Sequence, residues 1–197
     1  MWRTVGILRE MEAREPEVLE PDDVVVALAL EQREAFGELY ERYMPRVYRY
    51  LRTRLASGEE AADLTQLVFL RALEALPGYR IGRAPFAAWL FRIARNAATD
   101  AGRRRRPTVS LDGVPEGADP DGRDPEASAL RNERITRLGS LVASLAPGKR
   151  ELLALRFAGG LAPREIASIV GKREEAVKKQ LTRIVAALRE QYHDEVS

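Results

Sequence analysis

Apolar residues recur at every third or fourth position along most of the chain, which is the period of an amphipathic α-helix. The period holds over residues 24–55, where Pro45 predicts a kink or a junction without loss of the apolar face. It resumes after Ser57, which opens a capping-box pattern, and again over residues 86–106. The pattern predicts an all-α body over residues 24–106. The apolar face of its last helix comprises Phe86, Trp89, Leu90, Ile93, Ala94 and Ala97, with Trp89 interpreted as a core residue.

A second helical body follows a break in the pattern. Residues 107–123 combine Pro, Gly and Asp with almost no apolar content, which predicts a flexible acidic linker. The helical period then returns over residues 124–192, interrupted by the breaks at Pro147-Gly148 and Gly159-Gly160. We therefore expect two small helical domains. The apolar positions expected to face the second core are Leu130, Ile135, Leu138, Leu141, Val142, Leu145, Leu152, Leu153, Leu155 and Phe157.

Composition excludes several functional classes. The chain has 197 residues and no cysteine, so it has neither a disulfide framework nor a thiolate zinc site. Its one histidine, His193, lies in a short polar tail, 193–197, and predicts no metal centre or general base. Residues 1–23 are interpreted as a mobile acidic leader without the basic and apolar regions of a signal peptide. We expect a cytoplasmic protein with no membrane insertion, no cofactor and no catalytic activity.

Charge is distributed in blocks although the net charge is only +2. Residues 31–106 and 130–197 are basic, and the segment between them, 107–129, is acidic. Such alternation is typical of two polyanion-binding modules joined by a segment that avoids the same polyanion. The polar side of the stretch 86–106 fits this interpretation, although a solvated basic tail is the simpler alternative. Its polar residues are Arg92, Arg95, Asn96, Arg103, Arg104, Arg105 and Arg106.

The sharpest geometric pattern is that of a helix-turn-helix. Ala167 is a small residue where two helices would touch, Gly171 can adopt positive φ in the turn, and Val177 would seat the second helix. The second helix would then present charged residues to the major groove, whereas a plain helical hairpin with a charged face is the alternative. These residues are Arg173, Glu174, Glu175, Lys178, Lys179 and Arg183. The glutamates repel phosphate, so unaided duplex affinity is expected to be modest.

Both bodies resemble one protein family. The block from Asp63 to Ala72, followed by Phe86, Trp89-Leu90 and Ile93-Ala94-Arg95-Asn96, is similar to region 2 of bacterial RNA polymerase sigma factors. The segments Leu155-Arg156-Phe157, Gly159-Gly160, Glu165-Ile166-Ala167 and Val177-Lys178 are similar to region 4. Two such regions joined by a linker, with no third domain between them, resemble the extracytoplasmic-function (ECF) group of the sigma-70 family.

The resemblance implies a promoter-specificity subunit with defined partners. In the family, the second region-2 helix docks on the clamp helices of the polymerase β′ subunit, and region 4 contacts the β flap. The residues implied for the clamp contact are Asp63, Gln66, Leu67, Leu70 and Arg71. The loop before the next helix captures a base flipped from the minus-10 element, which implies Tyr79, Arg80, Ile81, Gly82 and Arg83. Arg92, Arg95, Asn96 and Arg103 to Arg106 would hold the non-template strand, and Arg173 to Arg183 would recognise minus-35 DNA.

Family resemblance further implies a dedicated anti-sigma partner. The alternative function is a stand-alone helix-turn-helix transcriptional regulator that binds duplex DNA by itself. The block from Asp63 to Ala72 and the separate basic helix favour the sigma factor, because a stand-alone repressor needs neither. An enzyme acting on nucleic acid is not supported, because the sequence has no phosphate-binding glycine loop and no clustered metal ligands.

Overall fold

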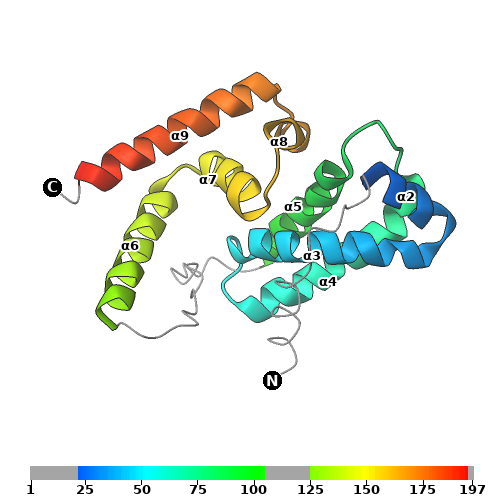
Figure 1. The fold of residues 1–197 in the computed structure, drawn as a ribbon, viewed down its shortest axis with the longest axis horizontal. Coiled ribbons are helices and arrows are strands. Elements are labelled where there is room, and N and C mark those ends of the chain that lie inside the picture. Colours follow the sequence, from blue (N-terminus) through cyan, green and yellow to red (C-terminus); the bar gives the residue numbers. More distant parts are fainter. Residues whose placement is uncertain (1–21, 105–124, 195–197) are drawn as a thin grey trace.

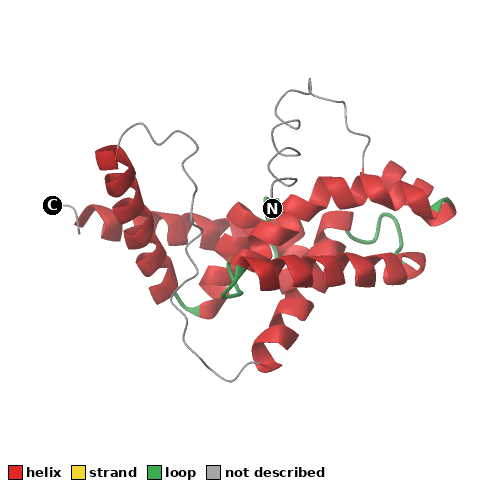
Figure 2. Cartoon of the chain, turned by 90° about the horizontal axis from the view of Figure 1, so that it is seen from below, coloured by secondary structure: helices red, strands yellow, loops and turns green. Residues whose placement is uncertain are grey.

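The computed structural model describes residues 22–104 and 125–194, and within these ranges every regular element is helical (Figures 1 and 2). The all-α prediction is therefore confirmed, whereas the predicted leader and linker lie outside the described residues. The N-terminal body comprises α2 (Asp22–Glu31), α3 (Phe36–Arg52), α4 (Gly58–Ala75) and α5 (Phe86–Arg104). The C-terminal body comprises α6 (Pro125–Ser144), α7 (Pro147–Leu153), a π-helical turn (Ala154–Ala158), α8 (Pro163–Val170) and α9 (Glu174–Asp194). The last helix thus continues beyond residue 192, where the tail was expected to begin.

The N-terminal body is a bundle in which α3 packs against both α4 and α5. Helix α3 runs through Pro45, so the junction that was one of the two predicted possibilities there is absent, and the helix keeps one buried face, as the pattern predicts. Helix α4 begins at the predicted cap, where the Ser57 hydroxyl accepts a hydrogen bond of 3.1 Å from the Glu60 backbone N–H. Its fully buried positions are Ala61, Thr65, Val68, Phe69 and Ala72. Leucines on either side of these positions are left half-buried or exposed.

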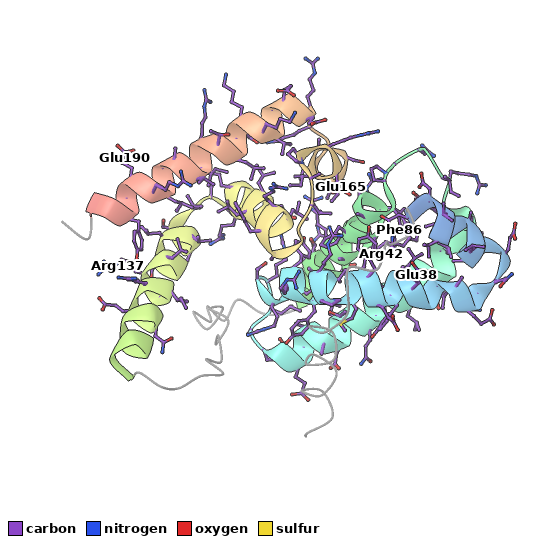
Figure 3. The ribbon with its side chains drawn as sticks, viewed as in Figure 1. Glu38, Arg42, Phe86, Arg137, Glu165 and Glu190 are labelled. Carbon is purple, nitrogen blue, oxygen red and sulfur yellow. The ribbon has the colours of Figure 1, made fainter. Side chains whose placement is uncertain are left out.

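A cluster of aromatic rings connects α3, α5 and the loop before α5. Phe86 is 1% exposed and lies inside the bundle (Figure 3). Its ring centroid is 5.5 Å from that of Tyr43, 5.9 Å from that of Tyr79 and 5.5 Å from that of Trp89. Edge and tilted ring contacts of this kind add to the stabilisation that burial provides. Trp89 packs against the core, as predicted, but its side chain is only partly buried.

Helix α5 is buried over a wider arc than the sequence pattern predicts. Phe91 is fully buried, although it is not among the residues of the predicted apolar face, while Trp89 and Ile93, which are, are only partly buried. The reason is that the two bodies touch: α8 lies against α5, and the π-helical turn lies against α3 (Figure 1). The C-terminal body therefore covers a flank of α5 that an isolated bundle would expose to water.

The C-terminal body forms its core from α7, α8 and α9. The deeply buried side chains include Leu155, Leu161, Ile166 and Val177. Two predictions for this core are wrong: Phe157 is 66% exposed and Leu138 is 47% exposed. Phe157 lies in the π-helical turn, whose wider winding displaces residues from the face that 3.6-residue periodicity assigns to them. Leu138 lies on α6, and the packing of α6 on α9 leaves this side chain exposed.

The buried phenol of Tyr43 predicts a loss of stability in alkali. Burial, followed by its hydrogen bond to Asp22, raises the pKa of Tyr43 above the ordinary value of 10.0. The folded chain keeps this proton where the unfolded chain loses it, so the contribution is full below about pH 10 and is lost as the pH rises further. We expect the free energy of unfolding in urea to fall above about pH 10, and to fall less steeply in Tyr43→Phe. Equal slopes in the two proteins would contradict this assignment.

Candidate nucleic-acid and polymerase interfaces

One side of α4 presents an exposed row of mixed character. Asp63, Gln66, Leu67 and Leu70 are all exposed, and their spacing places them on one face of the helix. Leu67 is 38% exposed and Leu70 is 58% exposed, while Arg71 is partly buried at the edge of the row. The structure thus brings together the residues predicted to contact polymerase. Neighbouring leucines that are exposed to solvent beside polar groups are typical of a protein-docking surface.

The loop between α4 and α5 is held at its base by Tyr79. This side chain is 4% exposed, its ring centroid lies 5.2 Å from that of Trp89, and its hydroxyl donates a hydrogen bond of 2.7 Å to the Ala84 carbonyl oxygen. Tyr79 was predicted to line a base-binding pocket, but here its ring belongs to the core and fixes the loop. Gly82 adopts a φ of 83°, which favours glycine. The exposed loop residues are Arg80, Ile81, Gly82 and Arg83.

The polar residues of α5 separate into two groups. Arg92 donates a hydrogen bond of 3.0 Å to the Ser168 carbonyl oxygen, and Arg95 lies 3.6 Å from a Glu151 carboxylate oxygen, so both face the C-terminal body. Asn96 and Arg103 are exposed. The first two arginines also remain open to solvent, since Arg92 is exposed and the Arg95 side chain is 42% exposed. Of the terminal arginines, Arg104 ends the helix, and Arg105 and Arg106 lie outside the described residues.

Helices α8 and α9 form the predicted helix-turn-helix. Ala167 is 7% exposed at the contact between the helices, and Val177, in the first turns of α9, is completely buried. Gly171 ends α8 with a φ of 67°, and the Lys172 backbone N–H donates a hydrogen bond of 3.1 Å to the Ala167 carbonyl oxygen. At the start of α8, the Glu165 carboxylate accepts a hydrogen bond of 2.6 Å from the Ala162 backbone N–H. Both ends of the short helix are thus fixed.

The charged face at the start of α9 is partly neutralised. Lys178 lies 2.9 Å from a Glu174 carboxylate oxygen and 3.0 Å from a Glu175 carboxylate oxygen. Hydrogen bonding to Glu174, and then to Glu175, raises the pKa of Lys178. Arg173 immediately precedes the helix, and Lys179 and Arg183 lie exposed along it. Lys178 is thus paired with Glu174 and Glu175. The other cations predicted to contact minus-35 DNA, which lie outside this group, are Arg173, Lys179 and Arg183.

Other kinds of site find no support in the described part of the chain. Residues 22–104 and 125–194 contain no group of three or more acidic, histidine or cysteine side chains positioned to hold a metal ion. None of the described helices combines the length and the apolar character needed to cross a membrane.

Two family models match the chain: Sigma-70 region 2 over residues 39–108, and Sigma-70, region 4 over residues 135–188. The sequence is 36% identical to the ECF RNA polymerase sigma factor BldN of Streptomyces coelicolor over 158 residues, which cover 80% of this chain and 60% of BldN. It is 35% identical to the ECF RNA polymerase sigma factor SigD of Mycobacterium tuberculosis over 176 residues, which cover 86% of this chain and 82% of SigD.

Solved structures of sigma factors share the fold. CnrH in complex with the cytosolic domain of CnrY has a TM-score of 0.64 and 26% identity, with 89% of this chain and 99% of CnrH covered; CnrH of Cupriavidus metallidurans is itself described as an RNA polymerase sigma factor. RpoE of Bartonella quintana, solved with the anti-sigma factor NepR, has a TM-score of 0.58 at 18% identity, with 80% of this chain and 96% of RpoE covered. The chain therefore belongs to the ECF RNA polymerase sigma factors, non-catalytic promoter-specificity subunits that bind the polymerase core and promoter DNA.

Proposed function

We propose that this sigma factor docks on the clamp helices of the polymerase β′ subunit through α4, captures and helps to melt minus-10 DNA with the N-terminal body, and recognises minus-35 DNA through α9. The observation that carries the proposal is the exposed row of Asp63, Gln66, Leu67 and Leu70. Burying leucines exposed to this extent against a partner is favourable, and the adjacent polar groups define the orientation of that partner.

The loop of residues 79–84 supports the assignment to minus-10 DNA. Tyr79 ties its two ends together, so that Arg80, Ile81 and Arg83 project from a fixed base. Extruding a base costs a few kcal/mol, which contacts with a preorganised loop offset better than contacts with a loop that must first become ordered. Arg103 at the end of α5 would contact a nearby phosphate of the same strand.

Helix α9 supports the assignment to minus-35 DNA. Arg173, Lys179 and Arg183 would contact phosphates or guanine edges, while Glu174 and Glu175 repel phosphate and pair with Lys178. These opposing charges favour weak binding of minus-35 DNA by the free chain. Binding becomes stronger once polymerase holds both bodies on one promoter, because the linked contacts raise the effective concentration of α9 at its DNA site. The C-terminal body would contact the β flap in that assembly.

An anti-sigma factor is the expected regulatory partner. CnrH was solved with the cytosolic domain of CnrY, and RpoE with the anti-sigma factor NepR. A protein that covers the α4 row or α9 would block polymerase or DNA. Polymerase, promoter DNA and the expected anti-sigma factor all act on transcription. We therefore propose that the protein is cytoplasmic.

Reconstituted transcription tests the proposed function. The full chain is mixed with bacterial core polymerase and a promoter library, and the start sites are mapped by sequencing the transcripts. We expect starts at a shared pair of minus-35 and minus-10 elements, dependent on the added chain. Failure to bind core, together with sequence-specific duplex shifts by the chain alone, would favour the stand-alone regulator instead.

A further inference from the structure

The charged face at the start of α9 has an uncharged side chain at its centre. Residues three and four positions apart are neighbours on a helix surface, so Thr182 lies beside Lys178 and Lys179, and Arg183 follows it directly. Thr182 is exposed, while Leu181 is buried. The proposed contacts to minus-35 DNA use only the charged residues of this face, which leaves Thr182 without a role.

Thr182 has its hydroxyl group committed to its own helix. The hydroxyl donates a hydrogen bond of 3.1 Å to the Lys178 carbonyl oxygen, four residues earlier. A threonine in a helix commonly bonds in this way, and the bond uses its only side-chain proton. The other group on Cβ is a methyl group, which this bond leaves free to contact a ligand. Thr182 thus offers DNA an apolar group in the middle of a charged face.

The charges on the N-terminal side of Thr182 are already paired with one another. Lys178 lies 2.9 Å from a Glu174 carboxylate oxygen and 3.0 Å from a Glu175 carboxylate oxygen. Both glutamates precede Lys178 in the helix, so the ion pairs direct its ammonium group away from Thr182. One positive and two negative charges leave this group with a net charge of −1, which disfavours a phosphate there. A base edge is therefore a better ligand at Thr182 than the DNA backbone.

Thr182 also borders apolar surface. It lines an open groove together with Phe157, Leu181, Val185 and Ala186, and Phe157 is 66% exposed. A methyl group placed against Thr182 would remove apolar surface from water on the ligand and on the protein, which is favourable. The position thus suits a small apolar group that reaches it from the major groove.

Thymine is the base that carries such a group. In the major groove it presents a C5 methyl group beside its O4 acceptor, whereas adenine, guanine and cytosine present hydrogen-bond donors and acceptors. Those three bases need a polar partner, and the Thr182 hydroxyl proton is already used. Contact between a threonine methyl group and the thymine methyl group is a known form of direct readout. The chemistry at Thr182 therefore matches thymine.

We propose that Thr182 is a specificity-determining residue whose methyl group contacts the C5 methyl group of one thymine in the minus-35 element. Lys179 and Arg183 flank it and supply the polar contacts to the neighbouring phosphates or guanine edges. This inference rests on the proposed function for the placement of α9 in the major groove, and it names one base that the helix recognises.

The full chain in complex with core polymerase tests the proposal on the duplex promoter identified by transcript mapping. Each thymine of the minus-35 element, on either strand, is replaced singly by deoxyuridine, which pairs in the same way and lacks the C5 methyl group. Dissociation constants come from competition with a fluorescent promoter fragment, followed by anisotropy. Thr182→Ser removes the methyl group and keeps the hydroxyl, whereas Thr182→Val keeps a methyl group and removes the hydroxyl.

Thr99→Ser is the matched control. Thr99 is also exposed, and its hydroxyl donates a hydrogen bond of 2.8 Å to the Arg95 carbonyl oxygen four residues earlier, but it lies on α5. The two serine variants thus make the same chemical change in the same local geometry. Because both positions are exposed, both variants should remain folded.

We expect one thymine at which uracil weakens binding by the wild type about fourfold, the contribution of one buried methyl group. Thr182→Ser should bind the thymine promoter about fourfold more weakly than the wild type and lose no further affinity with uracil at that position. Thr182→Val and Thr99→Ser should keep the wild-type sensitivity to uracil.

Equal sensitivity to uracil in the wild type and in Thr182→Ser would overturn the proposal, as would the absence of any sensitive thymine. Loss of affinity in Thr182→Val with full affinity in Thr182→Ser would also overturn it, because the hydroxyl would then be the group that contacts DNA. Binding that is unchanged when the minus-35 element is scrambled would refute the assignment of α9 to minus-35 DNA, and the inference with it. Binding that needs the intact element but shows none of the methyl effects would refute the inference alone.

Discussion

Leu67→Ala combined with Leu70→Ala is expected to weaken binding to core polymerase by about 100-fold, because covering each exposed leucine is worth about 1.5 kcal/mol or more. Both side chains are exposed to solvent on α4, so truncating them creates no internal cavity in the free chain. The loss should therefore appear in the complex and leave the stability of the sigma factor unchanged. Fluorescence anisotropy of the labelled chain, titrated with core enzyme, measures the dissociation constant directly.

Leu28→Ala is the matched control, because Leu28 is 46% exposed on α2 of the same body but lies outside the α4 row. Its affinity for core should stay close to that of the wild type, and thermal unfolding should confirm that both variants are folded. If the double variant kept full core affinity, the α4 row would not be the docking surface. A loss shared equally with Leu28→Ala would indicate a general effect on the N-terminal body.

Features set by local chain geometry could be predicted from the sequence. Ser57 caps α4 because a short polar side chain can reach the N–H group three residues later, and this depends on neighbouring residues alone. Gly171 takes positive φ because a helix that must turn sharply favours a residue without Cβ. The buried face of α8 follows from periodicity in the same way, whereas α4 buries Ala61, Thr65, Val68, Phe69 and Ala72 in place of its leucines. The helix-turn-helix was therefore recognisable before any packing was known.

Features set by packing between distant segments could not be predicted. Phe91 lies outside the predicted apolar face of α5, and it is buried by Tyr50 of its own body together with the backbone of Gly159 in the C-terminal body. Glu151 is one acid among many along the chain, yet its hydrogen-bond partner Tyr50 lies 101 residues away. Tyr79 shows the same limit within one body, since the closure of its loop turns the ring into the core. Periodicity identifies a face but does not identify what covers it.

Phe86→Ala is expected to lower the free energy of unfolding by about 3–5 kcal/mol, the usual cost of truncating a buried phenylalanine. The side chain is 1% exposed, and the rings of Tyr43, Tyr79 and Trp89 surround it. Its removal leaves a cavity beneath the loop of residues 79–84 and frees Tyr79, so minus-10 capture should weaken as well. Urea titration gives the stability, and open-complex formation with polymerase gives the functional loss.

Phe157→Ala makes the same chemical change at a position that is 66% exposed, so its unfolding free energy should stay within about 0.5 kcal/mol of the wild type. The comparison separates burial from residue type, since each variant loses one phenylalanine ring. A similar destabilisation in both would mean that the π-helical turn packs more tightly than its exposure indicates. A stable Phe86→Ala protein that still failed to open promoters would instead assign the aromatic cluster to positioning the loop, because stability and loop geometry would then have been lost separately.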